Sequence, residues 1–352
     1  MRNSVKIGKK WVGSGHPCFI VAEVGANHNG DLDTAKRLIQ KAAEAGVDAA
    51  KFQTVIADKH YSKNTPRFSC LENFGPLGTQ ELIRKYCEYP FEWHSILKKC
   101  AEEYGVEFFT SVFYQDAICE LEALDVPAYK IASFEIVDLG LISEAAKTGK
   151  PIILSTGMAT WEDIADAILV CKQETNENVI VLQCTSAYPT PPERVNLLAI
   201  RSLAERFNVV TGLSDHTVGI HVPVTAIAFG ARMIEKHFTM DRRQTGPDHP
   251  FSIEPDELSR MVKQIRDVES AIGDGSKNGP YPEELEMFEK GRRSIHARVC
   301  IPKGTVIRKD MLCVKRPGYG IAPKYLDEIV GLTAKNDIDE DRWITYDMLF
   351  LK

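Results

Sequence analysis

The fold of this chain is decided by two apolar stretches, VVTGLSDH (209–216) and RMIEKHF (232–238), each of which carries a histidine near its end. Apolar and β-branched residues dominate both stretches, which predicts two buried strands joined by a short helix. Neighbouring strand ends that each offer an imidazole, His216 and His237, suit a divalent metal with coordination positions left open for a substrate. The alternative is that one of these histidines only satisfies a hydrogen bond in the core.

The same pattern is repeated along residues 18–272. Alternating strands and helices build a parallel sheet, and eight such units are typical of a closed (β/α)8 barrel, the TIM barrel. Helix boundaries agree, because Asp31 and Thr160 stand at predicted N-caps and Gly46, Gly105 and Gly149 directly follow predicted helices. The eight apolar runs are CFIVAE, AAKFQ, EFFTS, AYKIAS, PIILST, VIVLQCT, VVTGLSDH and RMIEKH.

Length and composition allow a large enzyme of the α/β class. With 352 residues and 44% hydrophobic content, the chain can bury a barrel core and a small second domain. A formal charge of −6 argues against a general nucleic-acid surface, so no nucleic-acid partner is expected. The chain shows neither a bilayer-spanning apolar run nor a secretion signal, which predicts a cytoplasmic protein without a membrane partner. The nine cysteines lack paired CxxC spacing and indicate neither a disulfide framework nor a zinc ribbon.

Polar residues stand where each predicted strand ends. In a (β/α)8 barrel the carboxyl ends of all strands meet at one mouth, so these side chains are expected to surround one site. Solvation explains any single one of them, but not two lysines, two carboxylates and two histidines together. The candidates are Glu23, Lys51, Gln53, Thr110, Lys130, Ser133, Glu135, Ser155, Ser186, Ser214, His216 and His237.

These residue types favour chemistry on a small, doubly anionic substrate. Lys51 and Lys130, with several hydroxyls, can surround a phosphate and a carboxylate together. A metal on two imidazoles can polarise a carbonyl oxygen, while Glu23 and Glu135 can transfer protons. Carbon–carbon bond formation at an aldehyde, driven by an enol phosphate, agrees with this set, as does a metal-dependent hydrolase or aldolase. A Schiff-base aldolase using one of the lysines is a further alternative, although a bound anion would keep that lysine protonated.

Eight motifs distributed along the barrel are AEVGANHNGD (22–31), KFQT (51–54), YKIASFE (129–135), ILSTGM (153–158), QCTSAYPTPPE (183–193), GLSDHTVGI (212–220), ARMIEKHFTMDR (231–242) and GPDHPFSIEP (246–255). Together they resemble the nonulosonic (sialic) acid synthases. Members of that family condense phosphoenolpyruvate with an N-acetylated hexose aldehyde and water, and use manganese or magnesium. The resemblance implies the same substrates, cofactor and nine-carbon 2-keto-3-deoxy acid product for this chain.

The resemblance also implies a role for each candidate residue. His216 and His237 match the metal ligands, and Glu135, with Glu23 nearby, matches the catalytic carboxylate. The sugar-binding positions match Gln53, Tyr188 and Asp248. The positions that hold the phosphate and carboxylate of phosphoenolpyruvate match Lys51, Thr110, Lys130, Ser133, Ser155, Ser186 and Ser214.

Two features of the resemblance bear on the substrates. Some members have asparagine where this chain has Ser186, whose hydroxyl can still donate a hydrogen bond to a phosphate. YKIASFE and YPFEWHS (89–95) resemble the pseudaminic acid branch, whereas GPDHPFSIEP resembles the neuraminic and legionaminic branches. N-acetylmannosamine and 2,4-diacetamido-2,4,6-trideoxyhexoses are therefore both open as acceptors.

The chain is predicted to divide into a barrel (1–272), a linker (273–291) rich in glycine, proline and charge, and a small β-rich domain (292–352). Within the last of these, ARVCIPKGTVIRKDMLCVKRPGYGI (297–321) resembles the antifreeze-like (SAF) module of the same synthases. The resemblance implies a domain-swapped homodimer, in which this module reaches over the partner's barrel mouth and Arg316 contacts the sugar. A solvated basic turn is the alternative for Arg316, and the many charges disfavour ice binding.

Residues 54–90 are longer than a usual strand-to-helix connection in a barrel. The segment carries Tyr61, Lys63, Arg67 and Asn73. Long connections in compact domains are often lids or binding elements, and a disordered surface insertion is the alternative.

Overall fold

The computed structural model describes residues 4–68 and 77–351, which form two compact units that divide between Gly273 and Asp274. Cys70 and Asn73 lie outside the described residues.

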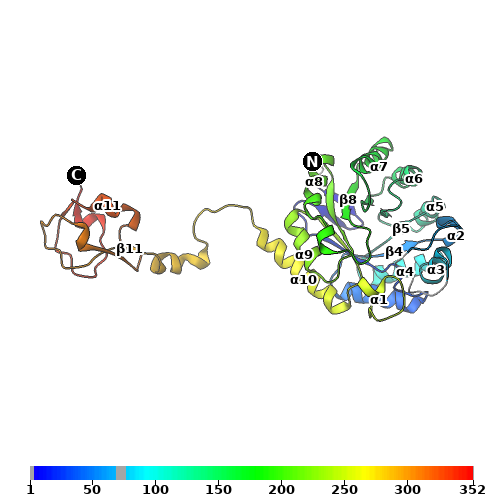
Figure 1. The fold of residues 1–352 in the computed structure, drawn as a ribbon, viewed down its shortest axis with the longest axis horizontal. Helices are drawn as coiled ribbons and strands as arrows, with labels where there is room; N and C mark the ends of the chain where they lie inside the picture. Colours follow the sequence, from blue (N-terminus) through cyan, green and yellow to red (C-terminus); the bar gives the residue numbers. More distant parts are fainter. Residues whose placement is uncertain (1–3, 69–76, 352) are drawn as a thin grey trace. The chain divides into compact units, whose positions relative to one another are not determined.

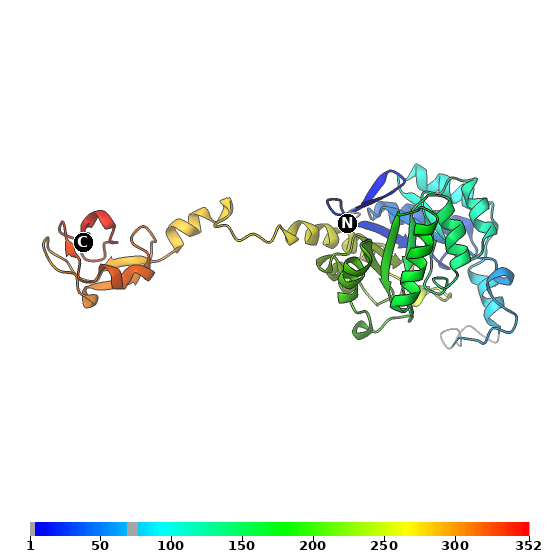
Figure 2. The same cartoon turned by 90° about the horizontal axis from the view of Figure 1, so that it is seen from above.

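The first unit is the predicted (β/α)8 barrel, with helices around a ring of parallel strands (Figures 1 and 2). Going round the ring, β10 pairs with β3, and the remaining strands follow in chain order until β9 closes onto β10. The strands are β3 (Phe19–Glu23), β4 (Ala49–Thr54), β5 (Glu107–Val112), β6 (Tyr129–Ile131), β7 (Ile152–Ser155), β8 (Val179–Cys184), β9 (Val210–Asp215) and β10 (Met233–His237).

Helices follow the strands as the periodicity predicts. The helices are α1 (Leu32–Glu44), α2 (Ala57–His60), α3 (Thr79–Tyr86), α4 (Trp93–Glu103), α5 (Asp116–Glu122), α6 (Leu139–Lys147), α7 (Trp161–Gln173), α8 (Leu198–Phe207), α9 (His221–Ala226) and α10 (Pro255–Ile272). The segment between β4 and α4, predicted as one long connection (54–90), contains two short helices, α2 and α3, among its described residues. Leu82 and Tyr86 of α3 pack in a small core with Val55. The described part of this segment is therefore folded rather than a disordered insertion.

Local signals explain where these elements begin and end. The Asp31 carboxylate accepts the N–H of Thr34 at 2.6 Å at the start of α1, and Thr160 forms the predicted capping box at the start of α7. The three glycines predicted to follow helices all have positive φ. Gly212 lies inside β9 because a Cβ there would stand 2.2 Å from the carbonyl oxygen of Met233.

Side chains alternate between the barrel interior and the helix layer along each strand. The amino-terminal part of the interior is apolar, as Phe19, Ala49 and Met233 show, whereas polar residues follow towards the carboxyl ends. A hairpin of β1 (Ser4–Ile7) and β2 (Lys10–Gly13), which the sequence did not predict, adds Val5, Ile7 and Val12 to this apolar cluster. The hairpin thus closes the amino end and leaves the carboxyl end as the functional mouth.

The second unit has its own small apolar core, in which Ile295, Leu312, Ile329 and Ile344 are buried. Its amino-terminal part, predicted as a linker, contains short helical turns at Pro282–Glu284 and Met287–Gly291. The unit is β-rich, as predicted, and its elements are β11 (Ser294–Ala297), β12 (Leu312–Lys315), α11 (Leu326–Ile329), β13 (Thr333–Ala334) and β14 (Leu349–Phe350).

Within residues 4–68 and 77–351, no helix combines the length and the apolar character that crossing a membrane requires. The cysteines in these ranges are all free thiols.

Candidate active site

A pocket opens at the carboxyl ends of the barrel strands, and most of the predicted site residues line it. We call it the mouth pocket. Adjacent strands bring these residues together because each contributes side chains from its interior-facing positions. The lining residues are Glu23, Lys51, Gln53, Ser111, Lys130, Ala132, Ser133, Phe134, Ser155, Cys184, Tyr188, Ser214, His216, Glu235 and His237.

Two buried lysines and two buried carboxylates form the charged floor of the mouth pocket. The ammonium of Lys51 lies 2.6 Å from Glu23 Oε2 and 3.8 Å from Glu235 Oε1. Lys130 Nζ donates to the same Glu235 oxygen at 2.9 Å, and the Ser214 hydroxyl donates to it at 3.0 Å. This network fixes both ammonium groups in place before any substrate arrives.

Burial and mutual attraction set the protonation of these groups. Burial alone would raise the pKa of Glu235, but Lys130 and Lys51 outweigh it and hold that pKa at about 2. Burial also tends to lower the pKa of Lys51, whereas the Glu23 and Glu235 carboxylates raise it to above its ordinary value. For Glu23, burial raises the pKa against the opposing effect of Lys51. Lys51 and Glu235 therefore carry their charges at neutral pH.

Glu235, Ser111 and Cys184 line the mouth pocket but were not predicted. Two-residue alternation puts Glu235 on the same side of β10 as His237, but its position inside an apolar run gave no sign of a site residue. Ser111 accepts a hydrogen bond from Lys51 Nζ at 3.0 Å. Cys184 lies with its sulfur 3.9 Å from Nδ1 of His216.

Thr110, predicted to bind phosphoenolpyruvate, is placed differently by the structure. Its hydroxyl lies 2.9 Å from that of Thr54, which in turn lies 2.7 Å from Nε2 of His94 on α4. Thr110 therefore faces the helix layer, and it is absent from the described lining of the mouth pocket. The physical reason is strand alternation, which points Ser111 inward and its neighbour outward.

His216 and His237 come together at the mouth as predicted, with ring centroids 5.3 Å apart. Nδ1 of His216 lies 2.9 Å from the Thr185 carbonyl, and donation there leaves the lone pair of Nε2 free. Burial lowers the pKa of His237 well below its ordinary value, and His216 and Lys51 lower it further, which keeps the imidazole neutral. A neutral imidazole such as that of His237 is a suitable ligand for a divalent metal. Burial also tends to lower the pKa of His216, but Cys184 and the Thr185 carbonyl outweigh burial and raise that pKa instead. Among the described residues, no group of three or more His, Cys, Asp or Glu side chains is arranged to hold a metal.

The predicted sugar-binding residues surround the histidine pair. Asp248 Oδ2 accepts the N–H of Ala26 at 3.0 Å and lies 3.6 Å from Nδ1 of His237. The Tyr188 ring lies 4.3 Å from the His216 ring, and Gln53 donates to Glu23 Oε1 at 2.8 Å. A ligand here would meet an aromatic face beside carboxylate and amide groups.

Hydroxyl groups occupy the β6 and β7 side of the mouth pocket. Ser133 Oγ accepts the N–H of Gly157 at 3.0 Å, and the buried Ser155 hydroxyl has no hydrogen-bond partner among the described residues. A Cβ at Gly157 would stand 2.2 Å from Ser186 Oγ, so glycine leaves room for that side chain. An unpartnered buried hydroxyl in the same pocket as two ammonium groups is a donor available to an anion.

Glu135 lies on the turn after β6 and is not part of the described pocket lining. Its carboxylate lies 3.8 Å from Nε2 of His60 on α2. Burial raises the pKa of Glu135 to about 7 and lowers that of His60 to about 4. Arg316 is exposed on the second unit, directly after β12.

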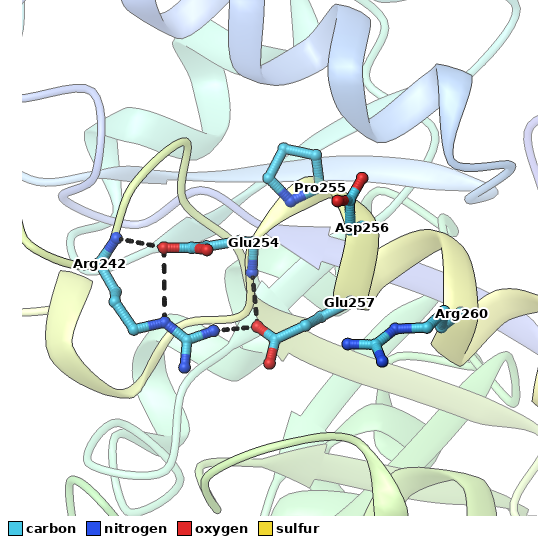
Figure 3. Close-up of a pocket in the computed structure, with 6 residues that line it drawn as sticks. All are labelled: Arg242, Glu254, Pro255, Asp256, Glu257 and Arg260. Carbon is cyan, nitrogen blue, oxygen red and sulfur yellow. Dashed lines mark hydrogen bonds and ion pairs between the residues drawn. The ribbon is translucent and has the colours of Figure 1, made fainter.

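A second hollow lies at the start of α10 and contains none of the predicted site residues (Figure 3). Two arginines line it, and the guanidinium of one of them, Arg242, is bound to Glu257 and lies 3.5 Å from Glu254 Oε1. Figure 3 shows these groups facing one another, so their charges are largely compensated within the hollow. The mouth pocket is therefore the candidate site.

Comparison with known proteins identifies the protein family. The NeuB family matches residues 38–277, which is most of the barrel. The chain belongs to the NeuB family. The SAF domain matches residues 292–349 of this NeuB-family chain, in agreement with the predicted C-terminal module.

Named relatives of this NeuB-family chain act in nonulosonic acid synthesis. The N,N'-diacetyllegionaminic acid synthase of Legionella pneumophila is 41% identical over 92% of both chains. The pseudaminic acid synthase of Campylobacter jejuni is 40% identical over 91% of this chain and 93% of its own. The crystal structure of the N-acetylneuraminic acid synthetase of Leptospira borgpetersenii has a TM-score of 0.73 and 32% identity, covering 82% of this chain and 97% of that one. The chain is thus an enzyme of the nonulosonic acid synthase class, which confirms the predicted family and reaction class.

Proposed function

We propose that this enzyme condenses phosphoenolpyruvate with the open-chain aldehyde of an N-acetylated hexose and water, giving a 2-keto-3-deoxy nonulosonic acid and phosphate. The observation that carries the proposal is the convergence of two buried ammonium groups with a histidine pair in one pocket. The ammonium groups suit the phosphate and carboxylate of one substrate, and the histidine pair suits the carbonyl oxygen of the other.

Phosphoenolpyruvate binds first in this proposal, on Lys51 and Lys130. Both ammonium groups are already fixed by Glu23 and Glu235, so little side-chain freedom is lost on binding. The Ser155 hydroxyl supplies a further donor, and Ser133, Ser186 and Ser214 stand at or after the carboxyl ends of β6, β8 and β9. The network's paired carboxylates keep the floor from being strongly cationic when the substrate is absent.

His216 and His237 would hold the divalent cation, Mn²⁺ or Mg²⁺. When bound, such a cation supplies Lewis-acid polarisation of the aldehyde oxygen. The protein contributes the orientation, because the Thr185 carbonyl fixes the His216 ring and Asp248 lies beside His237. Gln53, Tyr188 and Asp248 would position the sugar.

The enol carbon of phosphoenolpyruvate forms the new bond to the aldehyde carbon, and the aldehyde oxygen takes up a proton. Water then adds at C2, and cleavage of the bond between C2 and the bridging oxygen releases phosphate and leaves the 2-keto group. Glu135 is the proposed proton carrier because a pKa of about 7 populates both of its forms near neutral pH. Glu23 is the alternative, being closer to Lys51 and Gln53.

The quaternary part of the proposal is a domain-swapped homodimer. In it the second unit of one subunit reaches the mouth pocket of its partner, and Arg316 contacts the sugar. The support is the exposure of Arg316 on a SAF-type unit. The acceptor class is N-acetylmannosamine or a 2,4-diacetamido-2,4,6-trideoxyhexose.

The test is a phosphate-release assay with phosphoenolpyruvate and a panel of N-acetylmannosamine and the two 2,4-diacetamido-trideoxyhexoses. Release that depends on one aldehyde, with a nine-carbon keto acid seen by mass spectrometry, supports the proposal and identifies the acceptor. A hydrolase would release phosphate without any aldehyde. A binding module would show calorimetric binding but no release, and either result would overturn the proposal.

A further inference from the structure

Lys236 and Asp215 form a buried ion pair on the outer side of the strands that carry the two histidines. Strand alternation directs both away from the mouth pocket, whose described lining includes neither. The ammonium lies 2.6 Å from Asp215 Oδ2, and the two side chains are 0% and 1% exposed. The proposed reaction makes no use of this pair.

Lys236 binds the chain on both sides of His216. Its ammonium donates to the Asp215 carboxylate, which precedes His216, and to the carbonyl oxygen of Thr217, which follows it. Asp215 in turn accepts the N–H of Thr217 at 3.1 Å and its hydroxyl at 3.0 Å. One ammonium, itself next to His237 in sequence, thus joins the backbone segments of both histidines.

The strand register shows what this contact adds. Asp215 and Lys236 are the last paired residues between β9 and β10. His216 and His237 come one residue later, where that ladder no longer fixes the distance between the two chains. The ion pair therefore links β9 and β10 directly before the two histidines, where a link between the strands can set the distance between them.

We propose that the Lys236–Asp215 pair is a positioning element that sets the separation of His216 and His237, and with it the affinity of the metal site. This inference rests on the proposed role of the two histidines as metal ligands. A buried ion pair adds little net stability compared with apolar residues of similar volume, so stability alone does not account for it. Metal ligands need positions held within about 0.5 Å, which a buried, multiply bonded ammonium provides.

The test replaces both charges at once, as Lys236→Met with Asp215→Asn, so that no unpaired charge is left buried. The Kd for Mn²⁺, measured by calorimetry on metal-free protein, should rise by about 10-fold to 100-fold, the usual effect of losing support around a metal ligand. Phosphoenolpyruvate binding measured in chelator should stay within about two-fold, because Lys51 and Lys130 are not in contact with this pair. The control is Lys150→Met with Glu122→Gln, which removes the ion pairs of Lys150 with Glu122 at 2.8 Å and with Asp125 at 3.0 Å at the amino end of β7 and should leave the Kd for Mn²⁺ unchanged.

A milder variant covers the case in which the double variant does not fold. Thr217→Val removes only the hydroxyl donor to Asp215 and should raise the Kd for Mn²⁺ by about three-fold, as the loss of one hydrogen bond predicts. An unchanged Kd in a folded double variant, or in Thr217→Val if the double variant is unfolded, overturns the inference.

His216→Ala separates this inference from the proposed metal site. If His216→Ala binds Mn²⁺ like the wild type, the metal site itself is wrong, and the positioning role falls with it. If His216→Ala loses Mn²⁺ while the double variant keeps it, only the positioning role is wrong. Loss in both supports the inference.

Discussion

At the scale of single residues, the raised pKa of Glu135 makes the stability of the fold depend on pH. Its folded-state pKa of about 7 is above the ordinary value of 4.5, so the folded chain binds more protons than the unfolded chain between these values. The stability that the protonated Glu135 carboxyl contributes is therefore fully present below pH 4.5 and is lost as the pH rises through 7. The free energy of unfolding falls by on the order of 3 kcal/mol over this range.

Glu135→Gln should remove this pH-dependent loss of stability, because glutamine does not ionise. Relative to the wild type, the variant should gain free energy of unfolding between pH 5 and pH 8, as measured by denaturant unfolding at both pH values. Turnover should fall by about 10²-fold to 10⁴-fold if Glu135 carries the proton. A stability difference that is the same at both pH values would show that the raised pKa is wrong.

Ser111 and Thr110 are adjacent residues on opposite faces of β5, which makes them a matched pair. Ser111→Ala removes a partner of Lys51 and should raise the KM for phosphoenolpyruvate by about five-fold to ten-fold. Thr110→Val loses the hydrogen bonds of the Thr110 hydroxyl to Thr54 and to the Ser111 carbonyl, and should lower stability by about 1 to 2 kcal/mol without changing that KM. Steady-state kinetics and thermal unfolding of both variants check this, and a larger KM effect from Thr110→Val would restore the original assignment.

Some residues of the mouth pocket were predictable from the sequence, and others were not. Lys51, Lys130, His216 and His237 were predictable because charged groups at the ends of apolar runs have few positions other than the barrel mouth. Glu235 was missed because it stands inside an apolar run, where only its pairing with two lysines makes burial tolerable. That pairing joins strands far apart in sequence and is not visible before the barrel closes.

At the scale of elements, the β1–β2 hairpin is a plug rather than part of the ring. Its short strands lack helical segments around them, so the repeating pattern that predicted the barrel could not include it. Ile7 is fully buried among the interior residues of the barrel strands. The hairpin therefore contributes to stability at the end opposite the site.

Ile7→Ala should lower the free energy of unfolding by about 2 to 4 kcal/mol through lost burial and a cavity. KM values for both substrates should remain unchanged, because the change lies at the amino end of the strands. Lys9→Ala, at an exposed position of the same hairpin, is the control and should alter neither quantity. Denaturant unfolding and kinetics test the pair, and a KM shift in Ile7→Ala would mean that the plug also shapes the mouth.

At the scale of the whole molecule, the chain places its candidate groups on two units with separate cores. The sequence leads to the expectation of a division here, because glycine, proline and charge interrupt the barrel pattern after α10. It did not predict the helical turns within the linker, which are too short to produce a periodic pattern. The mouth pocket belongs to the first unit and Arg316 to the second, so the proposed swap predicts that a complete site needs two chains.

Co-expression of His216→Ala chains with Arg316→Ala chains, each carrying its own tag, tests the swap directly. In a swapped heterodimer, the intact second unit of the His216→Ala chain reaches the intact barrel of the other chain, so one site of the pair is complete. Heterodimers purified through both tags should show about half of the wild-type activity at low sugar concentration, because one of two symmetric sites is restored. His216→Ala paired with Lys130→Ala is the control: the barrel of each chain is then damaged, and no arrangement of the second units can restore a site. Activity no greater than the mean of the two parent homodimers would show that Arg316 serves its own chain or no sugar at all.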